Sequence, residues 1–104
     1  MIDILVRPIC KISQHKKLGV PLDSTVKLVC DVLAKPTDVS FYWAFNNSEE
    51  MLDVPVKQPK SNHLTSIAEI TPRTYGEYGT LFCWAKNSIG LQKVPCGFDI
   101  IPEG

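Results

Sequence analysis

Four cysteines are the residues of this chain with the clearest capacity for chemistry. Their positions are Cys10, Cys30, Cys83 and Cys96. Zinc sites are usually built from cysteine pairs about two to four residues apart. No such pair occurs in the sequence, and His15 and His63 have no partner at ligand spacing. We therefore expect no metal site and two disulfides, for which four cysteines allow three connectivities.

No sequence motif for another kind of chemistry stands out. The nucleophile elbow, the phosphate-binding glycine loop and the zinc protease motif are not found in the chain. The 11 Lys and Arg residues balance the 11 Asp and Glu residues, whereas a nucleic-acid binder is usually basic. We expect no catalytic residues, no cofactor, no small-molecule substrate and no nucleic acid, which favours a role in protein–protein contacts.

The elements that must position the cysteines are short strands. Alternating apolar and polar residues, interrupted by Pro, Gly, Asn and Asp, predict an all-β sandwich or barrel. The segment 46–63 is rich in loop-forming residues. The chain 1–104 is expected to be one domain, with a folded core of roughly 3–101 and a linker beginning at 102–104. The expected strands are about 3–7, 17–21, 25–33, 39–45, 51–56, 64–70, 79–87 and 91–100.

Three residues with inward-facing side chains carry a family resemblance. Side chains alternate along a strand, and this places Cys30, Trp43 and Cys83 on the core faces of three strands. This Cys–Trp–Cys set resembles the immunoglobulin superfamily. The resemblance implies a two-sheet, antiparallel Greek-key sandwich, in which a Cys30–Cys83 disulfide joins the sheets and the Trp43 ring fills the space beside it.

The late strand is similar to one subclass of that family. Residues 77–90, EYGTLFCWAKNSIG, resemble the pattern D-x-G-x-Y-x-C-x-A-x-N-x-x-G of intermediate-set (I-set) domains. One position departs from it, because Leu81 stands where the pattern has the tyrosine whose hydroxyl braces a corner of the sandwich. We expect Leu81 to be a core residue, and Tyr75 or Tyr78 to be the candidates for a replacement brace.

The resemblance also implies the second disulfide. Cys10 lies in the first strand region, which in this fold runs beside the last strand, so Cys10–Cys96 is the expected bridge. A hairpin turn at 87–90 would place Cys83 opposite Val94 and Cys96 opposite Leu81, so that Cys83 and Cys96 are diagonal neighbours.

The compartment follows from the cysteines and from one further motif. Two disulfides are typical of an oxidising, extracellular environment. Asn46 begins an N-x-S sequon directly after a predicted strand, where a surface glycan is accommodated. The first residues do not resemble a signal peptide, so we expect the domain to be part of a longer protein.

Several stretches resemble one group of receptors more closely. They are RPICK at 7–11, DVSFYWAFNNS at 38–48, YGTLFCWAKNSIG at 78–90 and PCGF at 95–98. Together they are similar to a membrane-proximal domain of the sidestep family of axon-guidance and adhesion receptors, with nephrin-like proteins as the runner-up. The resemblance implies a type I membrane protein that binds beaten-path proteins through another domain. The alternative is a structural I-set domain of an intracellular, muscle-type scaffold.

Three aromatic residues form the candidate binding site. Alternation places Tyr42, Phe82 and Trp84 on the outward faces of neighbouring strands, and aromatic residues are enriched in interface hot spots. The alternative is structural: cross-strand aromatic pairs stabilise sheets without a partner. The residues at 94–98, a glycan on Asn46 or a neighbouring domain would then cover them.

Overall fold

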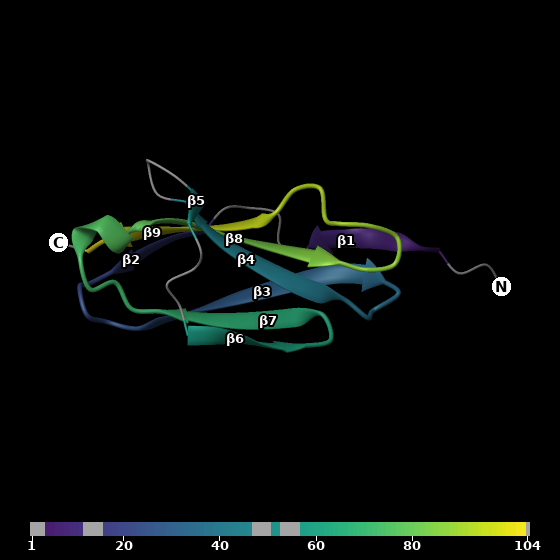
Figure 1. Cartoon of the computed structure of the whole chain (residues 1–104), viewed down its shortest axis with the longest axis horizontal. Coiled ribbons are helices and arrows are strands. Elements are labelled where there is room, and N and C mark those ends of the chain that lie inside the picture. Colours follow the sequence, from purple (N-terminus) through teal and green to yellow (C-terminus); the bar gives the residue numbers. More distant parts are fainter. Residues whose placement is uncertain (1–3, 12–15, 47–50, 53–56, 104) are drawn as a thin grey trace.

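The computed structural model describes residues 4–11, 16–46, 51–52 and 57–103. Within these ranges two sheets pack face to face (Figure 1). The elements are β1 (Val6–Cys10), β2 (Lys16–Val20), β3 (Val26–Lys35), β4 (Ser40–Asn46), β5 (Met51–Leu52), β6 (Lys57–Asn62), β7 (Thr65–Ile70), the 3₁₀ helix η1 (Tyr75–Glu77), β8 (Gly79–Lys86) and β9 (Cys96–Pro102).

The first two strands, β1 and β2, belong to different sheets. One has the strand order β1-β3-β7-β6 and the other β2-β9-β8-β4-β5. β2 pairs with β9 in parallel, and the other ladders are antiparallel. The predicted sandwich is therefore confirmed, but one of its sheets is mixed. β1 lies at one end of the long axis and the C-terminal end of β9 lies at the other (Figure 1).

Three strand predictions need correction. The first strand runs from Val6 to Cys10 instead of 3–7, and the last begins at Cys96 instead of 91. The segment predicted to be loop contains β6, which pairs with β7 alone. Pro59 lies within β6, and proline is tolerated there because an edge strand does not need every N–H for its ladder. Of the predicted strand 51–56, residues 53–56 lie outside the described part.

The core is built by the inward faces that alternation predicts. Phe45, Leu81 and Phe98 are cross-strand neighbours on β4, β8 and β9, and all three are buried. Leu28, Val32 and Ile70 cover them from the other sheet. Apolar burial of this kind supplies most of the free energy of folding, at about 25 cal/mol for each Å² removed from water.

Tyr78 makes the bracing hydrogen bond that Leu81, which has no hydroxyl, cannot make. Its hydroxyl donates a hydrogen bond of 2.6 Å to the backbone carbonyl of Val20, so the start of β8 is tied to the end of β2. Tyr75 is 70% exposed and its ring lies 6.0 Å from that of Tyr78. Of the two candidates, Tyr78 is therefore the one that makes the tie.

We expect Tyr78→Phe to lower the melting temperature by several degrees and to weaken the loss of stability at alkaline pH. Burial raises the pKa of the Tyr78 hydroxyl above its ordinary value of 10.0, and the charges of Tyr75 and Asp23 add to the shift. The protonated hydroxyl thus favours the folded state below pH 10, and this contribution is lost as pH rises through the raised pKa. Thermal melts from pH 7 to pH 11 measure both effects. Tyr75→Phe is the control, and equal behaviour of the two variants would contradict the assignment.

Candidate binding face and disulfide framework

The three predicted aromatic residues lie together on the outer face of the sheet β2-β9-β8-β4-β5. Tyr42 on β4 is the cross-strand partner of Trp84 on β8, and Ala44 is the partner of Phe82. The Phe82 and Trp84 rings lie 5.8 Å apart with their planes tilted by 41°, a geometry typical of favourable aromatic pairs. Tyr42 is 50% exposed, while Phe82 and Trp84 are half-buried. We name Tyr42, Phe82 and Trp84 the aromatic face.

Polar residues border the aromatic face at both ends. The Ser40–Lys86 pair follows Tyr42–Trp84 in one direction. In the other direction Asn46 is paired with Thr80, whose hydroxyl donates to the Asp99 carboxylate at 2.7 Å. Asn46 has the same alternation as Tyr42, so a glycan on its side chain would stand at the rim of the aromatic face. The rest of the sequon, residues 47–48, lies outside the described part.

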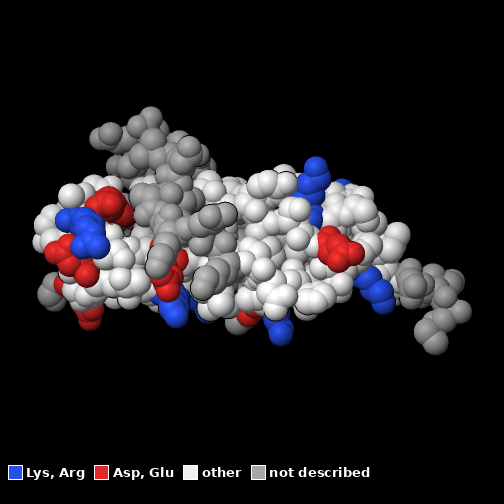
Figure 2. Space-filling view, turned by 60° about the horizontal axis from the view of Figure 1, so that its bottom comes forward, with Lys and Arg blue, Asp and Glu red and all other residues white. Residues whose placement is uncertain are grey.

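One face of the molecule carries charges of both signs. Figure 2 shows basic and acidic residues scattered over the surface in view, with both signs mixed at the end that carries η1. Two ion pairs lie at the surface: Arg73–Asp23 at 3.4 Å, with both side chains exposed, and Lys27–Glu69 at 3.8 Å, with Glu69 half-buried. Surface pairs of this kind contribute little to stability. The described surface in the view of Figure 2 shows no patch of one sign that would attract a strongly charged partner.

Both disulfides cross the sandwich from sheet to sheet. Cys30 on β3 is bonded to Cys83 on β8, with 6.5 Å between the Cα atoms, and Cys10 on β1 is bonded to Cys96 on β9, with 5.7 Å. This is the connectivity that the resemblance implies. The bridges lie side by side, since β1 pairs with β3 and β8 with β9. The prediction that the strand with Cys10 runs beside the last strand is wrong. β1 lies in the other sheet and reaches β9 across the core through the disulfide, whereas β2 is the strand that pairs with β9.

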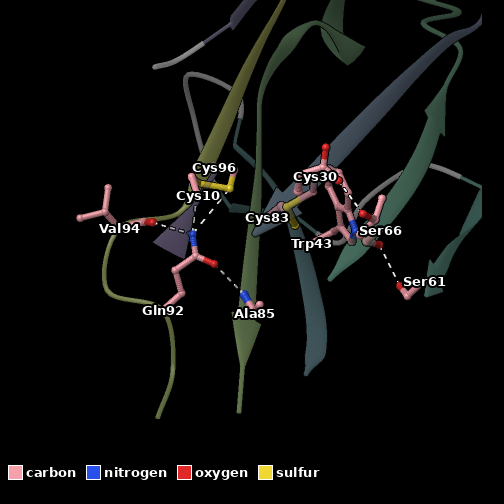
Figure 3. The surroundings of a disulfide bond; sticks show 12 residues. Cys10, Cys30, Trp43, Ser61, Ser66, Cys83, Ala85, Gln92, Val94 and Cys96 are labelled. Carbon is pink, nitrogen blue, oxygen red and sulfur yellow. Dashed lines mark hydrogen bonds between the residues drawn. A yellow bond between two sulfur atoms is a disulfide. The ribbon is translucent and has the colours of Figure 1, made fainter. Parts of the chain in front are cut away.

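Trp43 packs beside the Cys30–Cys83 bridge (Figure 3). It is the cross-strand partner of Cys83, and its ring stacks on Phe98 with centroids 5.9 Å apart. Its Nε1 donates at 2.9 Å to the hydroxyl of Ser66, which is fully buried on β7. The ring therefore fills the space beside the bridge and joins the two sheets by a hydrogen bond.

The predicted register of the last hairpin is wrong. The turn lies at 87–90 as expected, with mutual backbone hydrogen bonds of 3.2 Å between Asn87 and Gly90, and Lys86 is bridged to Leu91. Beyond a bend at 93–94 the pairing has slipped by two residues, so that Cys83 lies directly opposite Cys96. A slip by an even number keeps every side chain on its predicted face, which is why the cysteine partners still match.

Two buried amide side chains fix this hairpin. The Asn87 Nδ2 group donates to the carbonyls of Val6 and Pro36 at 2.9 and 3.2 Å, so one side chain joins three segments. Gln92 accepts from the Ala85 N–H at 3.0 Å and donates to the Val94 carbonyl at 2.8 Å. Sequence reasoning missed both roles. Asn87 belongs to the family pattern quoted above, which was a usable signal, whereas nothing marks Gln92.

The described residues hold no group of three or more His, Cys, Asp or Glu side chains that could bind a metal ion. His63 lies exposed in the turn between β6 and β7, and His15 is outside the described part. Within the described ranges no helix is long and apolar enough to cross a membrane.

Comparisons with known proteins agree on the fold. No family model and no curated protein matches the sequence. Among solved structures, titin M4 is similar with a TM-score of 0.72 and 16% identity, over 97% of this chain and 100% of that one. Titin domain M7 gives 0.69 and 16%, over 98% and 99%.

A similar match comes from a second protein. The four N-terminal Ig domains of Dscam1 isoform 4.44 give a TM-score of 0.70 and 17% identity, over 97% of this chain and 26% of that one. This chain thus spans about a quarter of the Dscam1 fragment. At these identities the likeness concerns the fold. Together with the inter-sheet disulfide and the strand order, it shows that the chain has the immunoglobulin fold.

Proposed function

We propose that the chain is an extracellular immunoglobulin module of a multi-domain cell-surface adhesion receptor, with a non-enzymatic role in recognition or as a spacer. The observation that carries the proposal is the pair of disulfides. All four cysteines are bonded, and both bridges cross one small core. Such bonds form and persist in the secretory pathway and outside the cell, and are rare in the cytosol.

The alternative function is that of a structural domain in an intracellular scaffold. The likeness to titin domains supports this candidate as much as the likeness to Dscam1 supports the first. The fold does not discriminate between the two, so the choice rests on the cysteines and on the Asn46 sequon.

Peptide mapping without reduction tests the proposal. The domain is produced through the secretory pathway, its free thiols are counted, and its linked peptides and any glycan on Asn46 are identified by mass spectrometry. We expect no free thiols, the pairs Cys10–Cys96 and Cys30–Cys83, and a glycan. Four free thiols in the folded domain would overturn the extracellular assignment and favour the scaffold.

Within that proposal, we infer that the longer protein to which this domain belongs, here called the parent, is a sidestep-like receptor. The support is the set of resembling stretches, together with the position of β1 and the end of β9 at opposite ends of the molecule (Figure 1). A module with this geometry can be joined in line with others. The parent would then be a type I plasma-membrane protein whose beaten-path-like partner binds a different domain. Binding of cell-surface beaten-path proteins by the parent ectodomain, but not by a form without its membrane-distal domain, is the expected result.

The aromatic face is the part of this domain best suited to a protein contact. We expect the double variant Phe82→Ala, Trp84→Ala to weaken self-association or binding to receptor-bearing cells at least about tenfold, since buried aromatic anchors dominate interface energies. Sedimentation velocity and cell binding of the multimerised domain measure the two contacts. Tyr75→Ala, which removes an exposed aromatic residue elsewhere, is the control. Unchanged binding by a folded double variant would contradict a binding role for the aromatic face and favour the spacer role of the domain.

A further inference from the structure

The two disulfides have different access to solvent. Cys30 and Cys83 are fully buried, whereas Cys96 is 8% exposed and Cys10 is only half-buried. Cys10 also lines a groove of about 480 Å³ on the surface. The other residues around this groove are Arg7, Pro8, Ile9, Lys93, Val94 and Pro95. A small molecule in this groove would therefore lie next to Cys10 while the protein stays folded.

The groove has a charge that suits an anionic nucleophile. Arg7 and Lys93 are the charged residues that line it, and both are cations. The rest of the lining is apolar or belongs to Cys10 itself. Disulfides are attacked by thiolates, which carry a negative charge. The groove thus favours the approach of a thiolate to Cys10.

The Gln92 amide donates to both sulfurs of the bridge, with the shorter contact to Cys10, so it can stabilise negative charge on either of them. Its Nε2 lies 3.2 Å from the Cys10 Sγ and 3.6 Å from the Cys96 Sγ, and the side chain is 2% exposed (Figure 3). The bonds to the Ala85 N–H and the Val94 carbonyl hold the amide in this orientation. An N–H donor makes a stronger hydrogen bond to a thiolate than to a neutral sulfur, so the amide favours bond breaking at this bridge.

We propose that Cys10–Cys96 is a thiol-exchange site, which a dithiol reductant opens while Cys30–Cys83 remains intact. One thiolate of the reductant attacks the Cys10 Sγ, the S–S bond breaks, and its electron pair remains on the Cys96 Sγ as a thiolate beside Gln92. The second thiol of the reductant, as a thiolate, then attacks the reductant sulfur of the mixed disulfide. The bond to Cys10 breaks, and Cys10 is released as a thiolate. The reductant is oxidised to a disulfide by two electrons, and its two protons go to Cys10 and Cys96.

The consequence concerns β1. The bridge is the covalent link between β1 and β9. Once it is open, β1 is held by its ladder with β3 and by the Asn87 bond to the Val6 carbonyl. The inference shares with the proposed function the requirement that the disulfides form, but it does not depend on a receptor role.

Differential alkylation tests the site. The oxidised domain, shown beforehand to contain no free thiols, is incubated at pH 8 without denaturant with increasing dithiothreitol. Exposed thiols are alkylated at intervals, and the remainder are reduced and labelled with a second, heavier alkylating agent. We expect Cys10 and Cys96 to be labelled together at least about tenfold faster than Cys30 and Cys83, at a rate proportional to the reductant concentration. Simultaneous reduction of both bridges, or no reduction of the folded domain, would overturn the proposal.

Two matched variants test the role of Gln92. Gln92→Glu keeps an acceptor for the Ala85 N–H but removes the amide donors near the sulfurs. We expect it to slow the reduction of Cys10–Cys96 about tenfold, since hydrogen bonds to charged groups are strong. Asn87→Asp makes the same chemical change in a buried amide whose recorded partners are backbone groups, and is the control. If Gln92 had only a structural role, both variants would instead speed up reduction by loosening the fold.

A missing disulfide would be recognised at the first step, because free thiols would then be present in the starting material. That result would count against the extracellular assignment. Failure of selectivity in a fully oxidised sample would count only against the exchange site.

Discussion

Replacement of Cys30 and Cys83 together by alanine is expected to lower the free energy of unfolding by about 5 kcal/mol, enough to leave much of the domain unfolded at 37 °C. The closed loop spans 53 residues, which corresponds to about 4 kcal/mol of chain entropy in the unfolded state. Both cysteines are fully buried, so the lost sulfur atoms also leave a cavity, which adds about 1 kcal/mol.

The variant Cys10→Ala, Cys96→Ala separates these two contributions. Its bridge closes a longer loop, with a separation of 86 residues, so chain entropy alone would make it the more damaging variant. Cys10 is only half-buried, and its removal leaves less of a cavity. Chain entropy contributes about 4.6 kcal/mol here, and with little added by a cavity we expect the total loss to stay slightly below that for the first pair. Equilibrium unfolding in guanidinium chloride measures both, and the reverse order would show that loop length dominates.

The second large effect is expected at Leu81. Its side chain is fully buried between Phe45 and Phe98 in the cross-strand order of the central sheet. Leu81→Ala should destabilise the domain by about 3 kcal/mol, because the lost contacts and the remaining cavity both count. Urea titration followed by tryptophan fluorescence is a suitable measurement, since Trp43 packs against Phe98.

Leu91→Ala is the matched control for that change. Leu91 is 49% exposed and sits at the end of the same hairpin, so its truncation should cost less than about 0.5 kcal/mol. Leu81→Tyr, which introduces the residue of the family pattern, should also destabilise. Tyr78 already bonds the Val20 carbonyl, and the larger ring would overfill a packed core. A stabilising tyrosine would mean that the corner accepts a second brace.

The faces of the strands could be predicted from the sequence because they depend on a local period of two. The burial of Leu81 and the exposure of Tyr42 both follow from alternation alone. The two-sheet arrangement came from the family resemblance. The mixed sheet could not be predicted, since pairing of β2 with β9 joins segments far apart in sequence.

The register of the last hairpin could not be predicted, for a physical reason. A turn at 87–90 can be recognised from its residues, but the two extra residues that shift Cys96 to a position opposite Cys83 are accommodated in the bend at 93–94. Gln92 holds that bend through bonds that form only in the folded state. The Tyr78 brace is of the same kind, because its acceptor lies 58 residues earlier in the chain.

The link between β1 and β9 also determines how the domain carries mechanical load. A pull along the chain enters through β1 and leaves through β9, and the Cys10–Cys96 bond connects these strands directly. The force therefore passes through the disulfide and not through the residues between the two cysteines. The chain between them is not stretched even when hydrogen bonds between the strands break. Extension is limited to the residues outside the bridge, each of which adds at most about 3.5 Å. With this bond closed the module behaves as a short, nearly inextensible connector, and with it open the intervening chain becomes extensible up to the second bridge.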